Sequence, residues 1–150
     1  MTSARSALKR AGVLLLAAAA ASVLATTAPA SNDPIAITFQ KAAVPGQPGY
    51  YRGTTGGAAT GESGTIEMWV SNSSVTGQMQ HFDVRIAASL ANGESFAAEL
   101  RGTFNFSTGN TLLTGTVTEG WLAGAQAREK GSYIGGGRFA GTLWLMPATA

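Results

Sequence analysis

The residues of this sequence that could do acid–base chemistry gather in one short stretch. His81, Asp83 and Arg85 alternate with apolar residues, and Glu99 and Arg101 do the same in the next apolar run. A histidine oriented by a carboxylate can act as a general base, which makes His81, Asp83 and Arg101 the candidate catalytic group. The alternative is a solvated outer face of a sheet, and the pairing of the two runs decides between them.

Both runs are predicted to be strands of one hairpin. Residues 79–90 and 94–106 alternate with a period of two, and Asn92-Gly93 between them is typical of a hairpin turn. A three-residue loop, with Gly93 as a left-handed bulge, puts apolar residues on one face and opposite charges on the other. The facing pairs are then Ile86–Ala98, Val84–Leu100, Phe82–Gly102, Arg85–Glu99, Asp83–Arg101 and His81–Thr103. This register favours two cross-strand ion pairs on the outer wall over a catalytic cluster.

Two more turns continue the meander. Ser107 and Asn110 are expected to close a two-residue loop, and residues 118–120 a three-residue loop. The pairs expected across these turns are Phe104–Leu113, Gly102–Gly115, Leu100–Val117, Thr103–Thr114, Arg101–Thr116, Val117–Trp121 and Gly115–Ala123. Small residues at 102, 115 and 123 would then lie side by side on the apolar face.

That belt of small residues has two interpretations. It can ease the curvature of a small barrel and seat large rings from neighbouring layers, or it can leave a cavity for an apolar ligand. The residues expected to bind such a ligand are Phe82, Leu100, Gly102, Phe104, Gly115, Trp121 and Phe139.

The rest of the chain also reads as short strands and turns. No stretch has the period of an amphipathic helix, Gly is scattered throughout, and there is no Cys. The expected strands are 34–41, 50–55, 65–71, 79–90, 94–106, 111–118, 121–128 and 138–146, and the expected longer loops are 56–64, 72–78 and 129–137. We predict an all-β, antiparallel up-and-down meander that closes into a small barrel of about eight strands, since closure removes the exposed edges.

The first 30 residues are predicted to be a cleaved signal peptide. Arg5, Lys9 and Arg10 precede an apolar run from 11 to 25, and Ala28-Pro29-Ala30 is an A-x-A cleavage site. The run is too short and too rich in Ala for a membrane anchor, so no stable anchor is expected after cleavage. We therefore expect a bacterial-type secreted, extracytoplasmic protein with one domain over 31–150.

The charged residues exclude several kinds of partner. Without the three basic residues of the leader, seven of the ten remain against eight acidic residues, so the mature chain is near neutral. No basic stripe points to nucleic acid. With one His, no Cys and dispersed acids, we expect no metal site and no cofactor.

The C-terminal third resembles a known family of barrels. Phe104-Asn105-Phe106, Gly109-Asn110 and Leu112-Leu113-Thr114-Gly115 precede a Gly-rich element, Gly135-Gly136-Gly137-Arg138-Phe139, that enters the last strand. This segment resembles the dirigent and allene-oxide-cyclase-like proteins, which implies an eight-stranded barrel with an apolar cavity. Their polar pocket residues do not map onto this sequence.

Three functions follow as hypotheses. The first is binding of a small apolar or aromatic molecule inside the barrel. The second is a cyclase or isomerase that uses the same cavity, which requires charged groups pointing inward. The third is a structural or surface-interaction module, with an exposed aromatic patch around Trp69, Tyr133 and Trp144. The sequence leaves the oligomeric state open.

Overall fold

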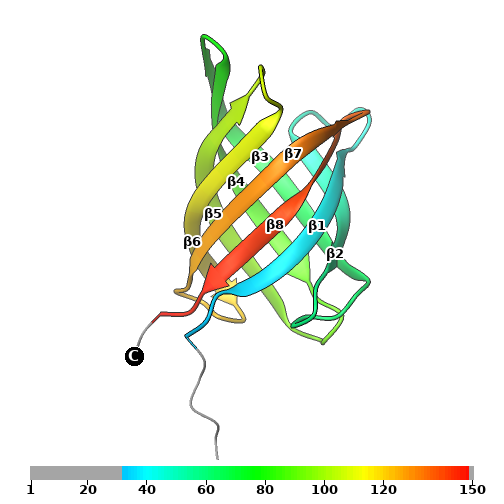
Figure 1. The fold of residues 1–150 in the computed structure, drawn as a ribbon, viewed down its shortest axis with the longest axis vertical. Helices are drawn as coiled ribbons and strands as arrows, with labels where there is room; N and C mark the ends of the chain where they lie inside the picture. Colours follow the sequence, from blue (N-terminus) through cyan, green and yellow to red (C-terminus); the bar gives the residue numbers. More distant parts are fainter. Residues whose placement is uncertain (1–31, 149–150) are drawn as a thin grey trace, which may run out of the picture. The chain divides into compact units, whose positions relative to one another are not determined.

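Eight antiparallel strands form the part of the chain that the computed structural model describes, residues 32–148 (Figure 1). Their bounds are β1 Ile35–Ala43, β2 Tyr50–Gly56, β3 Gly64–Thr76, β4 Met79–Ser89, β5 Ser95–Asn105, β6 Asn110–Gly120, β7 Gln126–Gly135 and β8 Arg138–Met146. The predicted leader, residues 1–30, lies outside the described residues. Within 32–148, no helix is long and apolar enough to cross a membrane.

The strands close into a barrel in simple up-and-down order. Each strand pairs with its neighbours in the sequence, and β1 pairs with β8 through contacts such as Ile37 opposite Leu143. The predicted all-β, eight-stranded closed meander is therefore confirmed. Closure gives every strand two neighbours, which pairs the backbone hydrogen-bonding groups of the barrel wall without a disulfide.

The β4–β5 hairpin has the register expected from the sequence. Val84 faces Leu100, Asp83 faces Arg101, and the other four pairs also agree. Gly93 has a φ of 91°, and its N–H donates to the carbonyl of Leu90. The apolar face of this hairpin points into the barrel, because one face must be buried and a slip of one residue would expose it.

The β5–β6 register was predicted wrongly by two residues. Gly102 faces Leu113 instead of Gly115, and Gly115 faces Leu100. The turn is longer than expected because the Asn105 side chain accepts hydrogen bonds from the backbone N–H groups of Ser107 and Thr108, at 2.8 and 3.3 Å. A shift of two keeps every side chain on its face, so alternation alone could not detect the error.

The β6–β7 turn also differs from the prediction. Strand β6 continues to Gly120, and Gly115 faces Ala127 instead of Ala123. Trp121 lies in the turn, where its backbone N–H donates to the carbonyl of Ser95. The longer pairing with β5, helped by a bulge between Ala97 and Ala98, displaces the turn toward the C-terminus. The expected row of small residues at 102, 115 and 123 does not form.

Two segments expected to be loops are strands. Residues 72–76 extend β3 into a hairpin whose tip projects beyond the barrel, visible in green in Figure 1. Residues 129–135 belong to β7, which begins five residues later than predicted. Polar residues suggested loops in both places. In the first they form exposed strand, and in the second the charged Glu129 is buried inside the barrel.

Gly102 and Gly115 allow adjacent strands to approach closely. A Cβ on Gly102 would lie 1.8 Å from the backbone oxygen of Leu112, and one on Gly115 would lie 1.9 Å from that of Glu99. Any larger residue would force the strands apart, so these glycines permit the tight coiling of a small barrel. The geometry agrees with the curvature interpretation of these two residues.

The barrel interior has two halves. The closed half adjoins the start of β1 and the end of β8, at the bottom of Figure 1. It is filled by buried apolar side chains, and Trp121 and Leu122 from the β6–β7 turn pack against them. Its buried members are Ile37, Ile66, Ile86, Ala88, Leu90, Phe96, Ala98, Val117, Ala125, Ala127, Leu143 and Leu145. The open half adjoins the β1–β2, β3–β4, β5–β6 and β7–β8 turns, and it contains a cavity.

Candidate functional site

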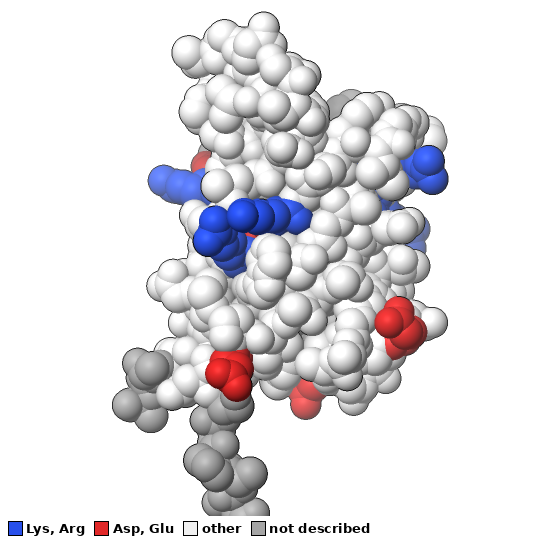
Figure 2. Space-filling view, in the orientation of Figure 1, with Lys and Arg blue, Asp and Glu red and all other residues white. Residues whose placement is uncertain are grey.

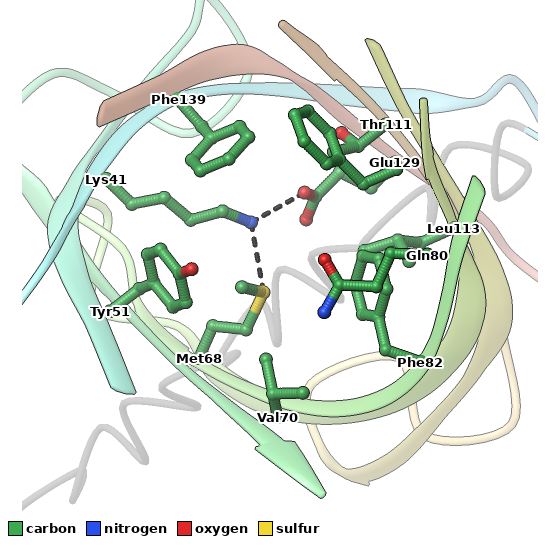
Figure 3. A pocket seen from close by; sticks show the side chains of 11 residues that line it. Lys41, Tyr51, Met68, Val70, Gln80, Phe82, Thr111, Leu113, Glu129 and Phe139 are labelled. Atoms are coloured by element: carbon green, nitrogen blue, oxygen red, sulfur yellow. Dashed lines mark hydrogen bonds and ion pairs between the residues drawn. The ribbon is translucent and has the colours of Figure 1, made fainter. Parts of the chain in front are cut away.

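The cavity of the open half has a volume of about 140 Å³ (Figure 3). Buried side chains form its floor and partly exposed ones form its walls and mouth. The floor consists of Lys41, Met68, Leu113 and Glu129, and the walls consist of Tyr51, Val70, Gln80, Phe82, Phe104, Thr111 and Phe139. Each of the eight strands contributes at least one of these residues. All of them occupy inward positions, because inward and outward side chains alternate along a strand.

A buried ion pair crosses the floor. Lys41 Nζ lies 2.6 Å from Glu129 Oε1, and the two residues are only 4 % and 1 % exposed. Lys41 also donates to Met68 Sδ at 3.2 Å, and its ammonium lies 4.5 Å from the centre of the Phe39 ring. An ammonium has three N–H donors, so a carboxylate, a thioether and an aromatic face together engage it. Figure 3 shows Lys41, Met68 and Glu129 meeting in the middle of the pocket.

Two oxygen atoms at the cavity have no hydrogen-bond partner in the protein. Glu129 Oε2 and Thr111 Oγ1 are both buried and unpaired. Thr111 and Glu129 are diagonal neighbours on β6 and β7, because Leu113 faces Glu129 and Thr111 faces Gly131. Figure 3 shows Thr111 beside Glu129. A buried polar atom without a partner costs about 1–3 kcal/mol, more when it is charged, so this arrangement calls for an explanation.

Aromatic rings surround the mouth. Phe139 makes edge contacts with Tyr51 and Phe104, at centroid distances of 5.9 and 5.7 Å. Tyr133 packs on Phe139 at 5.3 Å, and Phe106 packs on Phe104 at 5.2 Å. Burial raises the pKa of the half-buried Tyr51 hydroxyl, so this group remains protonated at neutral pH. The mouth therefore offers ring faces and edges to an aromatic molecule.

The residues predicted to bind a ligand fall into separate places. Phe82, Phe104 and Phe139 line the cavity together. The others do not line it: Leu100 belongs to the packed core, Trp121 packs against the closed half, and Gly102 and Gly115 lie at close strand contacts.

The predicted catalytic group lies on the outer wall. His81 is exposed, and Arg101 Nε lies 3.6 Å from Asp83 Oδ1 with most of its side chain in solvent. Asp83 also accepts a hydrogen bond from Asn72 at 2.9 Å. Exposed ion pairs of this kind contribute about 0–1 kcal/mol.

The neighbouring pair on the outer wall uses a different acid. Arg85 and Glu99 face each other as expected, but Arg85 forms its ion pair with Glu119 at 3.3 Å. Together with Asp83 and Arg101, these charged groups point away from the cavity.

The three aromatic residues considered for a surface patch lie apart. Trp69 stacks on Tyr50 near the open end, with ring centroids 5.4 Å apart. Trp144 faces Ala36 near the other end of β1. The rise per residue of a strand puts it about 20 Å from Trp69 along the barrel. Tyr133 belongs to the mouth of the cavity. These residues do not make one continuous patch.

The sequence reading missed the two charged residues of the site. Lys41 was placed at the end of the first strand, and Glu129 was assigned to a loop. Both keep the inward phase of their strands: Lys41 follows Ile37 and Phe39, and Glu129 follows Ala125 and Ala127. Extending the period of two past each charge would have put both side chains inside the barrel.

Charged side chains are sparse on the surface. Figure 2 shows them scattered over the visible face, with none on the projecting end. The sequence of that hairpin, residues 71–80, contains no charged residue. Within residues 32–148, no group of three or more His, Cys, Asp or Glu side chains could hold a metal ion.

Comparison of the chain with family models, curated proteins and solved structures finds no match.

Proposed function

We propose that this protein is a secreted barrel that binds a small, largely apolar or aromatic molecule in the cavity of its open half. The observation that carries the proposal is a cavity of about 140 Å³ with aromatic walls at one end of an otherwise packed barrel. An engineered apolar cavity of about 150 Å³ binds benzene, so this volume suits a single ring. Barrel mouths are also common places for ligand sites.

The charge of the cavity favours an uncharged molecule. Lys41 and Glu129 neutralise each other, and the other lining residues are uncharged. An ionic ligand would lose its hydration without gaining a free counter-charge, which is costly in a buried site. Phe82, Phe104 and Phe139 can instead contact a neutral ring through edge-to-face packing.

The test is a thermal shift with toluene as the probe. Binding at ten times Kd stabilises the folded state by about 1.4 kcal/mol, which raises Tm by about 3–8 °C for a domain of this size. Val70→Phe fills the cavity from its wall, so toluene should shift its Tm far less. Val75→Phe is the matched control, because Val75 is exposed on the projecting hairpin.

The wild-type melting curve decides the outcome. No toluene shift up to its solubility limit would contradict the proposal, whatever the variants do. An equal shift in wild type and in a cooperatively melting Val70→Phe variant would place the binding elsewhere and would also contradict it.

A second candidate is an enzyme of the cyclase or isomerase type. One observation favours it: the cavity holds an amine and a carboxylate 2.6 Å apart, which meets the requirement for inward charged groups. The test is incubation with small epoxides and cyclic enones, followed by NMR. Conversion that Glu129→Gln abolishes and the outer-wall variant Glu99→Gln retains would support it, and an absence of conversion would count against it.

A further inference from the structure

Two nitrogen donors of the cavity have partners within the protein, whereas two of its oxygen acceptors have none. Lys41 directs its N–H groups to Glu129 Oε1, Met68 Sδ and the Phe39 ring. Gln80 also lines the cavity, and its amide nitrogen donates to Ser73 Oγ at 2.7 Å. Each of these two nitrogen donors therefore already has a partner within the protein.

Two oxygen acceptors of the cavity have no partner within the protein. Glu129 Oε2 is a carboxylate oxygen, which can only accept, and it has no partner although its residue is 1 % exposed. Thr111 Oγ1 lies beside it and is also unpaired. A ligand group that donates a hydrogen bond would satisfy the carboxylate oxygen and could bond the hydroxyl as well.

Gly131 leaves room for the Thr111 hydroxyl. A Cβ at Gly131 would lie 2.7 Å from Thr111 Oγ1 and 3.4 Å from the Phe39 ring. The absence of that Cβ makes room for the threonine hydroxyl on the inner face, where it lines the cavity with Glu129. The position of the Thr111 hydroxyl on β6 therefore depends on the glycine that faces it on β7.

We propose that the ligand is a neutral single-ring compound with an N–H or O–H donor, and that its donor group binds Glu129 Oε2 and Thr111 Oγ1. This inference rests on the proposed binding function and specifies the chemical class of the ligand. The ring lies among Phe82, Phe104 and Phe139, and the donor points to the floor. The hydrogen bond to the carboxylate is the stronger contact, because bonds to charged groups are worth about 1.5–3 kcal/mol.

The test compares aniline with toluene, which has nearly the same shape and no donor. Aniline is uncharged at neutral pH. The two molecules differ in their hydration, but this difference belongs to the free ligands and cancels when wild type and variant are compared. The measured quantity is therefore the change in the ratio of the two Kd values, obtained by calorimetric or NMR titration.

Two variants remove the acceptors. Thr111→Val should weaken aniline relative to toluene by about twofold to tenfold. The double variant Lys41→Met/Glu129→Leu removes the carboxylate without leaving a buried charge, and it should weaken aniline relative to toluene by about tenfold or more. Thr55→Val is the matched control, since Thr55 Oγ1 is also buried and unpaired but does not line the cavity.

The outcomes separate this inference from the function on which it rests. If toluene binds and both variants leave the ratio unchanged, the ligand class is wrong and the binding function stands. If the Thr55→Val variant changes the ratio as much as Thr111→Val, the assignment of the acceptor is wrong. If neither probe binds to wild type, both proposals fail.

Discussion

The closed and open halves of the barrel interior are built from the same strands but by different interactions. In the closed half, inward positions carry Ile, Leu, Val, Ala and Phe, and the β6–β7 turn covers the end with Trp121 and Leu122. In the open half, the inward positions of the same strands carry Lys41, Glu129, Thr111 and Gln80 among aromatic rings. One half excludes water by packing, and the other keeps a cavity with polar atoms.

This difference indicates that the closed half mainly stabilises the fold and that the open half is suited to binding. Apolar packing in the closed half stabilises the closed barrel, at about 25 cal/mol for each Å² of apolar surface buried. The ion pair of the open half gives little net stability, because removing two charges from water offsets most of their attraction. A polar floor is therefore better explained by what it can bind than by what it adds to folding.

The largest expected effect comes from breaking the buried ion pair on one side. Lys41→Met leaves the carboxylate of Glu129 buried without a counter-charge, which should lower the free energy of unfolding by about 3–5 kcal/mol. Urea unfolding measures this loss. Arg101→Met, which breaks the exposed pair with Asp83, is the matched control and should cost about 0–1 kcal/mol. Equal losses for the two variants would contradict the distinction between buried and exposed pairs.

A smaller effect should distinguish packed side chains from those that line the cavity. Leu143 is fully buried in the closed half, so Leu143→Ala should cost about 2–5 kcal/mol through lost contacts and a new void. Val70 is half-buried beside the existing cavity, so Val70→Ala should cost only about 1 kcal/mol. Denaturant midpoints of both variants test the comparison, and a larger loss for Val70→Ala would reverse it.

The smallest expected effect concerns alkaline pH. Burial raises the pKa of Tyr51 above its ordinary value of 10.0, so the folded barrel holds this proton more tightly than the unfolded chain. Stability from this group is complete below about pH 10 and is lost as the pH rises through the folded pKa. Tyr51→Phe should therefore flatten the fall in Tm measured between about pH 9 and about pH 11.

Tyr50 provides the comparison for that measurement. Its hydrogen bond to Glu67 also raises its pKa, but this partly exposed side chain lies on the outer face of the barrel, where solvent screens the interaction. Tyr50→Phe should leave most of the alkaline fall in place. If it flattens the curve more than Tyr51→Phe does, burial in the open half is not the cause.

The sequence predicts the closed meander well because two local signals agree. In residues 79–106 the apolar face and the opposite charges require one register, and the structure has it. The β5–β6 turn lacks such charges, and a slip of two residues preserves both faces. Hydrogen bonds from the Asn105 side chain choose the longer turn, and alternation does not reveal them.

The sequence predicts the aromatic residues of the candidate site but not its two charged residues. Phe82, Phe104 and Phe139 are apolar inward residues, so their place in the cavity follows from strand phase. Lys41 and Glu129 lie 88 positions apart, and each one alone looks like the polar end of a strand. A charge can be buried only with its partner, and closure of the barrel supplies that partner.

The seam between β1 and β8 has a consequence for folding kinetics. It joins the two ends of the described chain, so it carries the largest loop-closure entropy of any strand pair and is expected to form late. Lys41 on β1 reaches Glu129 on β7 across β8, which means that the cavity floor is assembled only when this seam shuts. A molecule in the cavity would then slow the opening of the barrel and leave the rate of its closing unchanged.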